Sequence, residues 1–188
     1  AMFDIWMRLL KQVEGSVFWL WVGHPKAIEN LQKEAAARGV DPQRLVFASR
    51  IKHADHLARH RLADLFLDTL PFNAHTTASD ALWTGLPVVT CAGTTFAGRV
   101  AASLLNAANM PDLITNSLED YEALALKLAT DDAALQDVRT RLQQNLNSCP
   151  LFDTDLTRRH VEAAYETMWQ KHQEGAPAQG FSVTPVKA

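Results

Sequence analysis

Apolar runs typical of β-strands alternate with helix-like segments along most of this 188-residue chain. The strand-like runs are rich in Val, Leu, Phe and Trp, and they cover residues 16–22, 44–49, 63–69, 86–91 and 112–115. Helix-forming residues fill the segments between these runs, and glycines such as Gly39 mark where helices end. Strands that alternate with helices predict a parallel sheet with helices on both faces. Because crossovers are right-handed, we expect a Rossmann-like, doubly wound α/β domain.

The same pattern predicts a single domain over residues 1–150, followed by a C-terminal helical extension. The sequence SCPLFD at 148–153 interrupts the alternation, and we expect the helix over 151–172 to pack back on the domain. The tail over 173–188 contains Gly, Pro and Ala, which predicts flexibility. The sequence begins abruptly inside an amphipathic helix, so we expect an upstream part of the protein to be missing.

Composition and charge argue against several kinds of partner. The net charge of −3 leaves no basic excess for nucleic acid, and no apolar run approaches the roughly 20 residues of a membrane helix. The first residues also lack the features of a signal peptide. Cys91 and Cys149 fit neither a metal pattern nor a disulfide framework, which favours a reducing, cytoplasmic location.

Polar side chains gather where the strand-like run 63–69 ends and the next helix begins. His75, Thr76 and Thr77 stand at that junction, and Asp80 follows one turn later. Ligands of doubly wound sheets bind at the carboxyl ends of strands, and a helix N-terminus favours anions. Hydroxyl and imidazole donors there suit a phosphate or diphosphate, while a carboxylate beside them suits neutral hydroxyls such as those of ribose. The simpler interpretation, that Thr76 caps the helix and Asp80 favours its first turn, stays open.

The longest motif resembles a known enzyme family. The sequence DTLPFNAHTTASDALWTGLPVVT at 68–90, followed by TFAGRVAASLL at 95–105, is similar to the C-terminal catalytic half of the O-linked N-acetylglucosamine transferase and SPINDLY family. The flanking RLADLFLDT and CPLFDT fit too, and the resemblance extends from Phe3 to Trp169. An acid followed by A-x-x-x-G-x-P-V-V is also similar to the nucleotide-sugar domain of two-domain, GT-B type glycosyltransferases.

The resemblance implies an activity and a set of contacts. Such an enzyme moves N-acetylglucosamine from UDP to protein Ser or Thr hydroxyls without a metal or other cofactor. It implies a diphosphate site of His75, Thr76 and Thr77, a ribose site of Asp80 and His53, and a uracil site of His56, Arg50 and Ile51. His53 stands where some relatives have a lysine, which leaves the donor sugar open. The relatives hold the acceptor with an N-terminal Rossmann half and helical repeats, so we expect this chain to be inactive alone.

Other interpretations of the same residues remain open. His53, His56 and His60 have the spacing of one helix face and would offer three nitrogens to zinc, although no carboxylate spacing completes such a site. A UDP-sugar epimerase on the same scaffold would need acid and base carboxylates that the sequence does not show together. A non-catalytic nucleotide-binding or interaction module is the third alternative. We expect Trp19, Trp21 and Trp83 to lie in the core.

Overall fold

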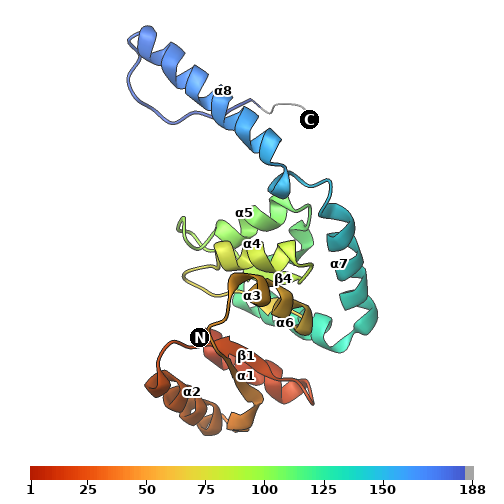
Figure 1. Cartoon of the computed structure of the whole chain (residues 1–188). Coiled ribbons are helices and arrows are strands. Elements are labelled where there is room, and N and C mark those ends of the chain that lie inside the picture. Colours follow the sequence, from red (N-terminus) through yellow and green to blue (C-terminus); the bar gives the residue numbers. More distant parts are fainter. Residues whose placement is uncertain (185–188) are drawn as a thin grey trace.

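The computed structural model describes residues 1–184 and confirms a parallel α/β fold (Figure 1). Its strands, each within one of the predicted apolar runs, are β1 (Phe18–Trp21), β2 (Leu45–Ala48), β3 (Phe66–Leu67), β4 (Val88–Cys91) and β5 (Ile114–Thr115). Every observed strand pair is parallel, as crossovers through helices require.

The strands form two hydrogen-bonded groups. Strand β1 pairs with β2, with Phe18 opposite Leu45, whereas β4 lies between β3 and β5. The chain therefore passes outward from β1 to β2, returns past β1 to β3, and continues outward in the opposite direction. This reversal of direction is the point at which doubly wound folds bind ligands.

Helices occupy the crossovers and the C-terminal region. They are α1 (Met2–Gln12), α2 (Pro25–Ala37), α3 (His53–Arg59), α4 (Thr76–Trp83), α5 (Val100–Ala107), α6 (Leu118–Thr130), α7 (Asp132–Asn145) and α8 (Thr154–Gln173). Local sequence explains several of their first residues. The hydroxyl of Ser117 accepts a hydrogen bond of 3.0 Å from the backbone N–H of Asp120, and the carboxylates of Asp131 and Asp153 cap α7 and α8 in the same way.

Two clusters of buried side chains form the core. The larger cluster surrounds β4 and includes Leu82, Val88, Leu105, Tyr121 and Leu142. The smaller cluster lies between β1, β2 and the helices beside them, and it consists of Met7, Leu10, Ala35, Val40 and Leu45. Helix α1 contributes to both, because its Ile5 and Leu9 belong to the larger cluster. The two groups of strands are thus joined through α1.

The tryptophans correct one expectation. Trp19, Trp21 and Trp83 are 36%, 62% and 56% exposed, so none of the three is a core residue. On β1 the side chains alternate, and Trp19 and Trp21 share the face opposite the smaller cluster. A strand that reads as wholly apolar in sequence is therefore covered on one face only in this chain.

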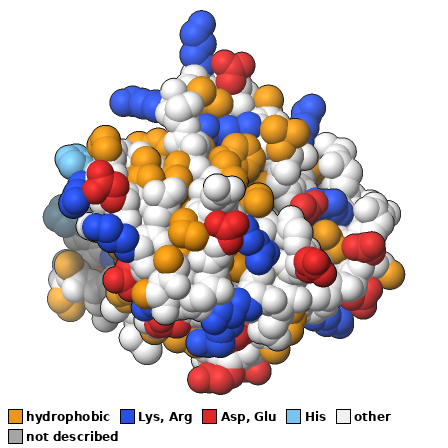
Figure 2. All heavy atoms as spheres, turned by 90° about the horizontal axis from the view of Figure 1, so that it is seen from below, with side chains coloured by type: hydrophobic (Ala, Val, Ile, Leu, Met, Phe, Trp, Pro, Cys, Tyr) orange, Lys and Arg blue, Asp and Glu red, His pale blue; other side chains and the backbone are white. Residues whose placement is uncertain are grey.

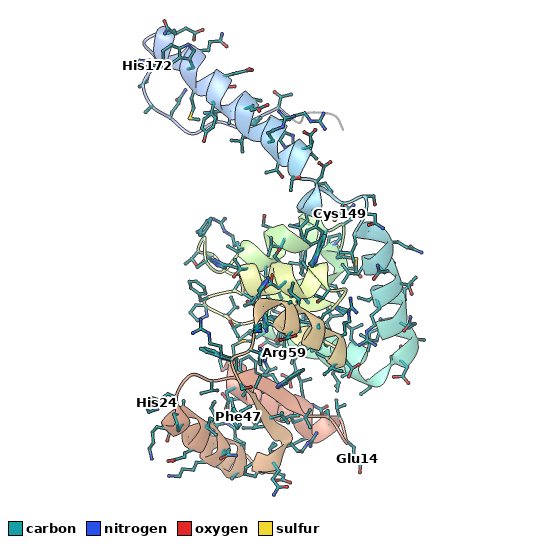
Figure 3. All side chains as sticks on the ribbon, viewed as in Figure 1. Glu14, His24, Phe47, Arg59, Cys149 and His172 are labelled. Atoms are coloured by element: carbon teal, nitrogen blue, oxygen red, sulfur yellow. The ribbon has the colours of Figure 1, made fainter. Side chains whose placement is uncertain are left out.

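The C-terminal helix α8 also differs from expectation, because it projects from the body instead of packing back on it (Figure 1). No side chain of α8 is fully buried, and Tyr165 and Trp169 are more than 60% exposed. A 3₁₀ turn, η4 (Pro150–Phe152), joins α8 to the body near Cys149 (Figure 3). There Phe152 packs edge-on against Trp83. Residues 174–184 run back beside α8, and the rest of the predicted flexible tail lies outside the described residues.

The surface shows no field of a single charge on the face seen from below. Figure 2 shows basic and acidic side chains interspersed with apolar ones over that face. Within residues 1–184, no helix is both long enough and apolar enough to cross a membrane.

Candidate functional site

A pocket opens at the carboxyl end of β3, directly before α4. Its volume is about 440 Å³, and the segment from Asp68 to Thr77 supplies most of its lining. His75, Thr76 and Thr77 all border it, so the three residues that the sequence predicted at a helix start lie together. Their roles as ligand contacts are taken up below as a proposal.

The start of α4 presents unpaired donors to this pocket. His75 occupies the N-cap position, but its side chain accepts no hydrogen bond from the backbone of the first turn. Thr76 and Thr77 are exposed residues of that turn. The first helical hydrogen bond runs from Ser79 N to His75 O at 3.1 Å, so the amides of residues 76–78 have no acceptor within the helix. Thr76 is therefore not the cap that the simpler interpretation required. Together, the amides, the hydroxyls and the helix dipole favour an anion.

Aromatic rings hold His75 in place. Its imidazole stacks on Phe72, with centroids 4.7 Å apart, and meets Phe96 edge-on at 6.3 Å. Its Nε2 atom is buried and has no hydrogen-bond partner. A buried polar atom without a partner costs about 1–3 kcal/mol of free energy. A hydrogen bond between His75 Nε2 and an oxygen of a bound ligand would remove this cost.

Asp68 is buried below the pocket and holds the loop that lines it. The sequence analysis assigned this residue no role. Its side chain is 1% exposed, and its two carboxylate oxygens accept hydrogen bonds of 2.6 Å from Ala74 N and Thr90 Oγ1. The Tyr121 hydroxyl donates to the backbone oxygen of Asp68 at 2.9 Å. Burial raises the pKa of Asp68, while the hydrogen bonds from Ala74 and Thr90 oppose that shift. The sequence did contain a signal for Asp68. An acid at the end of a buried strand, just before the His-Thr-Thr run, is a candidate for holding the loop between that strand and the next helix.

A second loop supports the first. The backbone N–H of Asn73 donates to Ala97 O at 2.9 Å, and Gly93 N donates to Gly98 O at 2.6 Å. A Cβ atom on Gly98 would lie 3.1 Å from the backbone oxygen of Pro71, so a larger residue there requires the two loops to move apart by a few tenths of an ångström.

The residues predicted for a nucleoside also lie close together. His53 Nε2 is 3.8 Å from Asp80 Oδ2, across the space between the starts of α3 and α4. Burial, followed by the charges of His60 and Arg59, lowers the pKa of His56, whereas the Asp80 carboxylate opposes the shift. The Asp80 carboxylate thus acts electrostatically on His56 as well as lying beside His53.

The loop between β2 and α3 carries the two remaining predicted residues. Arg50 and Ile51 are exposed there, immediately before the helix that carries His53 and His56. His56 and Thr77 border the same large cavity, so the residue predicted to stack on the base and the first turn of α4 face a common space.

A zinc site is not formed by the three histidines. His60 is buried, and its Nδ1 lies 2.9 Å from the backbone oxygen of His56. Across residues 1–184, no group of three or more His, Cys, Asp or Glu side chains has an arrangement that suits a metal ion. Cys91 and Cys149 are buried free thiols.

Known proteins are similar to this chain in both sequence and fold. A UDP-N-acetylglucosamine–peptide N-acetylglucosaminyltransferase of Caenorhabditis elegans is 35% identical over 93% of this chain and 15% of its own length. A probable enzyme of the same name, SEC of Arabidopsis thaliana, is 39% identical over 96% of this chain and 18% of its own length. The chain thus spans less than a fifth of these relatives.

Solved structures give the same result. A mutant O-GlcNAc transferase of Thermobaculum terrenum superposes with a TM-score of 0.87 at 33% identity, over 93% of this chain and 34% of that one. This match confirms the Rossmann-like, doubly wound fold expected from the sequence. The family model described as glycosyl transferase family 41 matches residues 1–161. This chain therefore belongs to glycosyl transferase family 41.

Proposed function

We propose that this chain is the donor-binding half of a protein O-glycosyltransferase that moves N-acetylglucosamine from UDP to Ser or Thr hydroxyls. His75, Thr76 and Thr77 bind the diphosphate, and Asp80 with His53 binds the ribose. His56 stacks on uracil, while the backbone at Arg50 and Ile51 contacts the edge of the base. The observation that carries the proposal is that Asp80, on the same helix as Thr76 and Thr77, lies 3.8 Å from His53, so the donor-rich helix start adjoins the predicted ribose residues.

The proposed chemistry needs no metal or other cofactor. UDP leaves with negative charge on its diphosphate, and the amides at the start of α4 with the Thr76 and Thr77 hydroxyls stabilise that charge directly. The unpartnered Nε2 of His75 adds a further polar contact. These groups are fixed before the reaction begins, so they do not have to reorganise as the bond to the sugar breaks.

The acceptor and the rest of the enzyme come from outside residues 1–188. We assign residues 1–150 to the donor domain and 151–172 to a C-terminal helix, with an N-terminal Rossmann half and helical repeats completing the protein. The exposed apolar residues of α8, including Tyr165 and Trp169, are consistent with contacts to further parts. A cytoplasmic location follows from the same proposal and agrees with the two free, buried thiols.

Titration calorimetry with UDP tests the proposal. The double variant Thr76→Val with Thr77→Val keeps the side-chain volume but removes two hydroxyl donors, so we expect the Kd for UDP to rise at least tenfold. Thr130→Val removes a hydroxyl from α6 and serves as the matched control. An unchanged affinity of the double variant would exclude the Thr76 and Thr77 hydroxyls as contacts of the diphosphate. GDP in place of UDP reports whether the base is recognised.

A further inference from the structure

A chain of hydrogen bonds connects α1 with the loop that carries the residues proposed for the diphosphate. The indole Nε1 of Trp6, on α1, donates to the hydroxyl of Tyr121 on α6 at 3.3 Å. That hydroxyl donates in turn to the backbone oxygen of Asp68 at 2.9 Å. Asp68 follows β3 directly, and its carboxylate accepts the N–H of Ala74, the residue before His75. The contacts of α1 thus lead, step by step, to the start of α4.

The chemistry of these groups fixes the direction of both bonds to Tyr121. An indole N–H can only donate, so the hydroxyl oxygen is its acceptor. The hydroxyl has a single proton, and the carbonyl of Asp68 can only accept it. Burial raises the pKa of Tyr121, so the hydroxyl keeps that proton throughout the physiological range. A phenylalanine in place of Tyr121 would therefore break both bonds at once.

Tyr121 itself lies outside the donor site. Its side chain is 0% exposed, so neither the ring nor the hydroxyl can touch a bound ligand. The next residue, Glu122, faces the outside of the same helix and forms a two-pronged ion pair with Arg8 of α1. Helices α1 and α6 are thus tied twice. Of these two ties, the inner one continues to Asp68.

The residues proposed for the nucleoside belong to the β1–β2 group of strands. His53 and His56 lie on α3, which follows β2 after a short loop. The guanidinium of Arg59, at the end of that helix, donates to Ser49 O at 2.8 Å and lies 5.9 Å from the ring centroid of Trp19 on β1. Helix α3 is therefore held to the strands that precede it.

The residues proposed for the diphosphate belong to the other group of strands. The backbone N–H of Asp68 donates to Val89 O at 3.0 Å, and the Thr90 hydroxyl donates to the Asp68 carboxylate at 2.6 Å. The loop before His75 is thereby fixed to β4. Under the proposed function, UDP reaches from one group of strands to the other. Because the length of UDP is set by its bonds, its affinity depends on where the two groups lie relative to each other.

Helix α1 joins the two groups, and Trp6 adds a directional contact to that junction. The ring of Trp6 packs on Phe18 of β1, with centroids 4.7 Å apart, while its Nε1 bonds to Tyr121. The apolar contacts of α1 with the two core clusters resist separation but have no preferred direction. Hydrogen bonds weaken steeply as their distance and angle change, so the bonds from Trp6 through Tyr121 to Asp68 set the position of β3 against β1.

We propose that Tyr121 is a positioning residue of the donor site, whose hydroxyl fixes the diphosphate loop relative to the β1–β2 group through Trp6 and Asp68. This inference rests on the proposed function, because it concerns how UDP meets both sets of residues at once. Without the hydroxyl, each set keeps its local structure, since Asp68 still holds Ala74 and Arg59 still holds Ser49. Their relative position becomes variable.

Calorimetry with two ligands tests this role. Tyr121→Phe keeps the buried ring and removes only the hydroxyl, and we expect the Kd for UDP to rise about threefold to tenfold, the range of one hydrogen bond's net contribution. Inorganic pyrophosphate reaches only the start of α4, so its Kd should stay within about twofold of that for the unmodified chain. An equal loss for both ligands would indicate a loosened loop, and it would contradict a change in spacing.

A second variant and a matched control examine the same bonds. Trp6→Phe breaks the chain of hydrogen bonds at its other end and should weaken UDP binding similarly. The double variant with Tyr121→Phe should lose no more than either single variant, because both act through one path. Arg8→Gln breaks the outer tie to Glu122 and should leave the Kd for UDP unchanged. Additive losses in the double variant, or an equal loss for Arg8→Gln, would overturn the role of the hydroxyl.

A measurement without ligand separates this inference from the proposed function. Spin labels at Lys33→Cys on α2 and Gln144→Cys on α7, both exposed positions, report the distance between the two groups by double electron–electron resonance. The native cysteines are buried. We expect a wider distribution of distances in Tyr121→Phe than in the chain with Tyr121, and an unchanged distribution would overturn the proposal. If the chain with Tyr121 fails to bind UDP, the proposed function is wrong, while the distance distribution still decides whether the hydroxyl fixes the two groups.

Discussion

The buried carboxylate of Asp68 accepts a hydrogen bond of 2.6 Å from the backbone N–H of Ala74, six residues further along the chain. This bond closes the loop that leads from β3 to α4 and so sets where His75 and Thr76 stand. The second oxygen of Asp68 receives the Thr90 hydroxyl from β4, which ties the loop to the neighbouring strand.

Removing that carboxylate should loosen the donor site. Asp68→Ala leaves the Ala74 amide and the Thr90 hydroxyl without their acceptor, and we expect a loss of about 1–3 kcal/mol in the free energy of unfolding. Asp68→Asn keeps one acceptor and removes a charge whose burial is unfavourable, so its loss should be smaller. Urea denaturation measures both. If Asn is as damaging as Ala, the negative charge, and not the hydrogen bond to Ala74, is the important feature.

Protonation of His56 should make the fold less stable in acid. Its pKa lies below the ordinary 6.5 because of burial and the charges of His60 and Arg59, with His53 acting in the same direction and Asp80 against it. Between that lowered pKa and 6.5 the unfolded chain binds more protons than the folded one, so stability falls as pH drops through this window.

The variant His56→Ala lacks this contribution, so its Tm should fall less than that of the unmodified chain between pH 7.5 and pH 5. Scanning fluorimetry at several pH values measures the difference. His172→Ala, on the projecting helix α8, is the control and should follow the unmodified chain. Parallel curves for His56→Ala and the unmodified chain would show that another group causes the acid sensitivity.

A lysine at position 53 should strengthen UDP binding. His53 is 72% exposed and lies 3.8 Å from the Asp80 carboxylate, where a permanent positive charge would face both the acid and a bound diphosphate. We expect His53→Lys to lower the Kd for UDP about twofold to fivefold at low salt, a gain of about 0.4–1 kcal/mol typical of exposed charges. Calorimetry at 0.05 M and 0.5 M NaCl checks this, since screening should remove most of the gain. A gain that persists at 0.5 M NaCl would point to a direct hydrogen bond instead.

Residues 1–188 alone should bind UDP weakly and transfer no sugar. The proposed N-terminal half would form the other wall of the cleft; without that wall the diphosphate is exposed to water, and each hydrogen bond to it contributes only about 0.5–1.5 kcal/mol net. Transfer also loses the positioning of donor against acceptor, which is worth up to about 7–11 kcal/mol. A radiolabelled UDP-N-acetylglucosamine assay on peptide, run beside the titration, separates the two. Clear Ser or Thr glycosylation by this chain would place the acceptor site within it.

Local features of the fold could be predicted from the sequence. The strand-like runs contain all five observed strands. The grouping of His75, Thr76 and Thr77 at a helix start also follows from local order, since a strand, a short loop and a helix determine it. These features depend on contacts within a few residues, which periodicity and side-chain chemistry describe well.

The tertiary structure decided what depends on distant residues. The hydroxyl of Tyr121 reaches the backbone of Asp68 from 53 positions away, and Thr90 reaches its carboxylate from 22, so the local position of Asp68 made it a candidate but only the tertiary structure showed which groups it holds. The same holds for the exposed Trp21, for the projection of α8 and for the division of the strands into two groups. An apolar run shows that a segment can be buried, but the partner that buries it is set by how the whole chain packs, and here part of that packing surface is open.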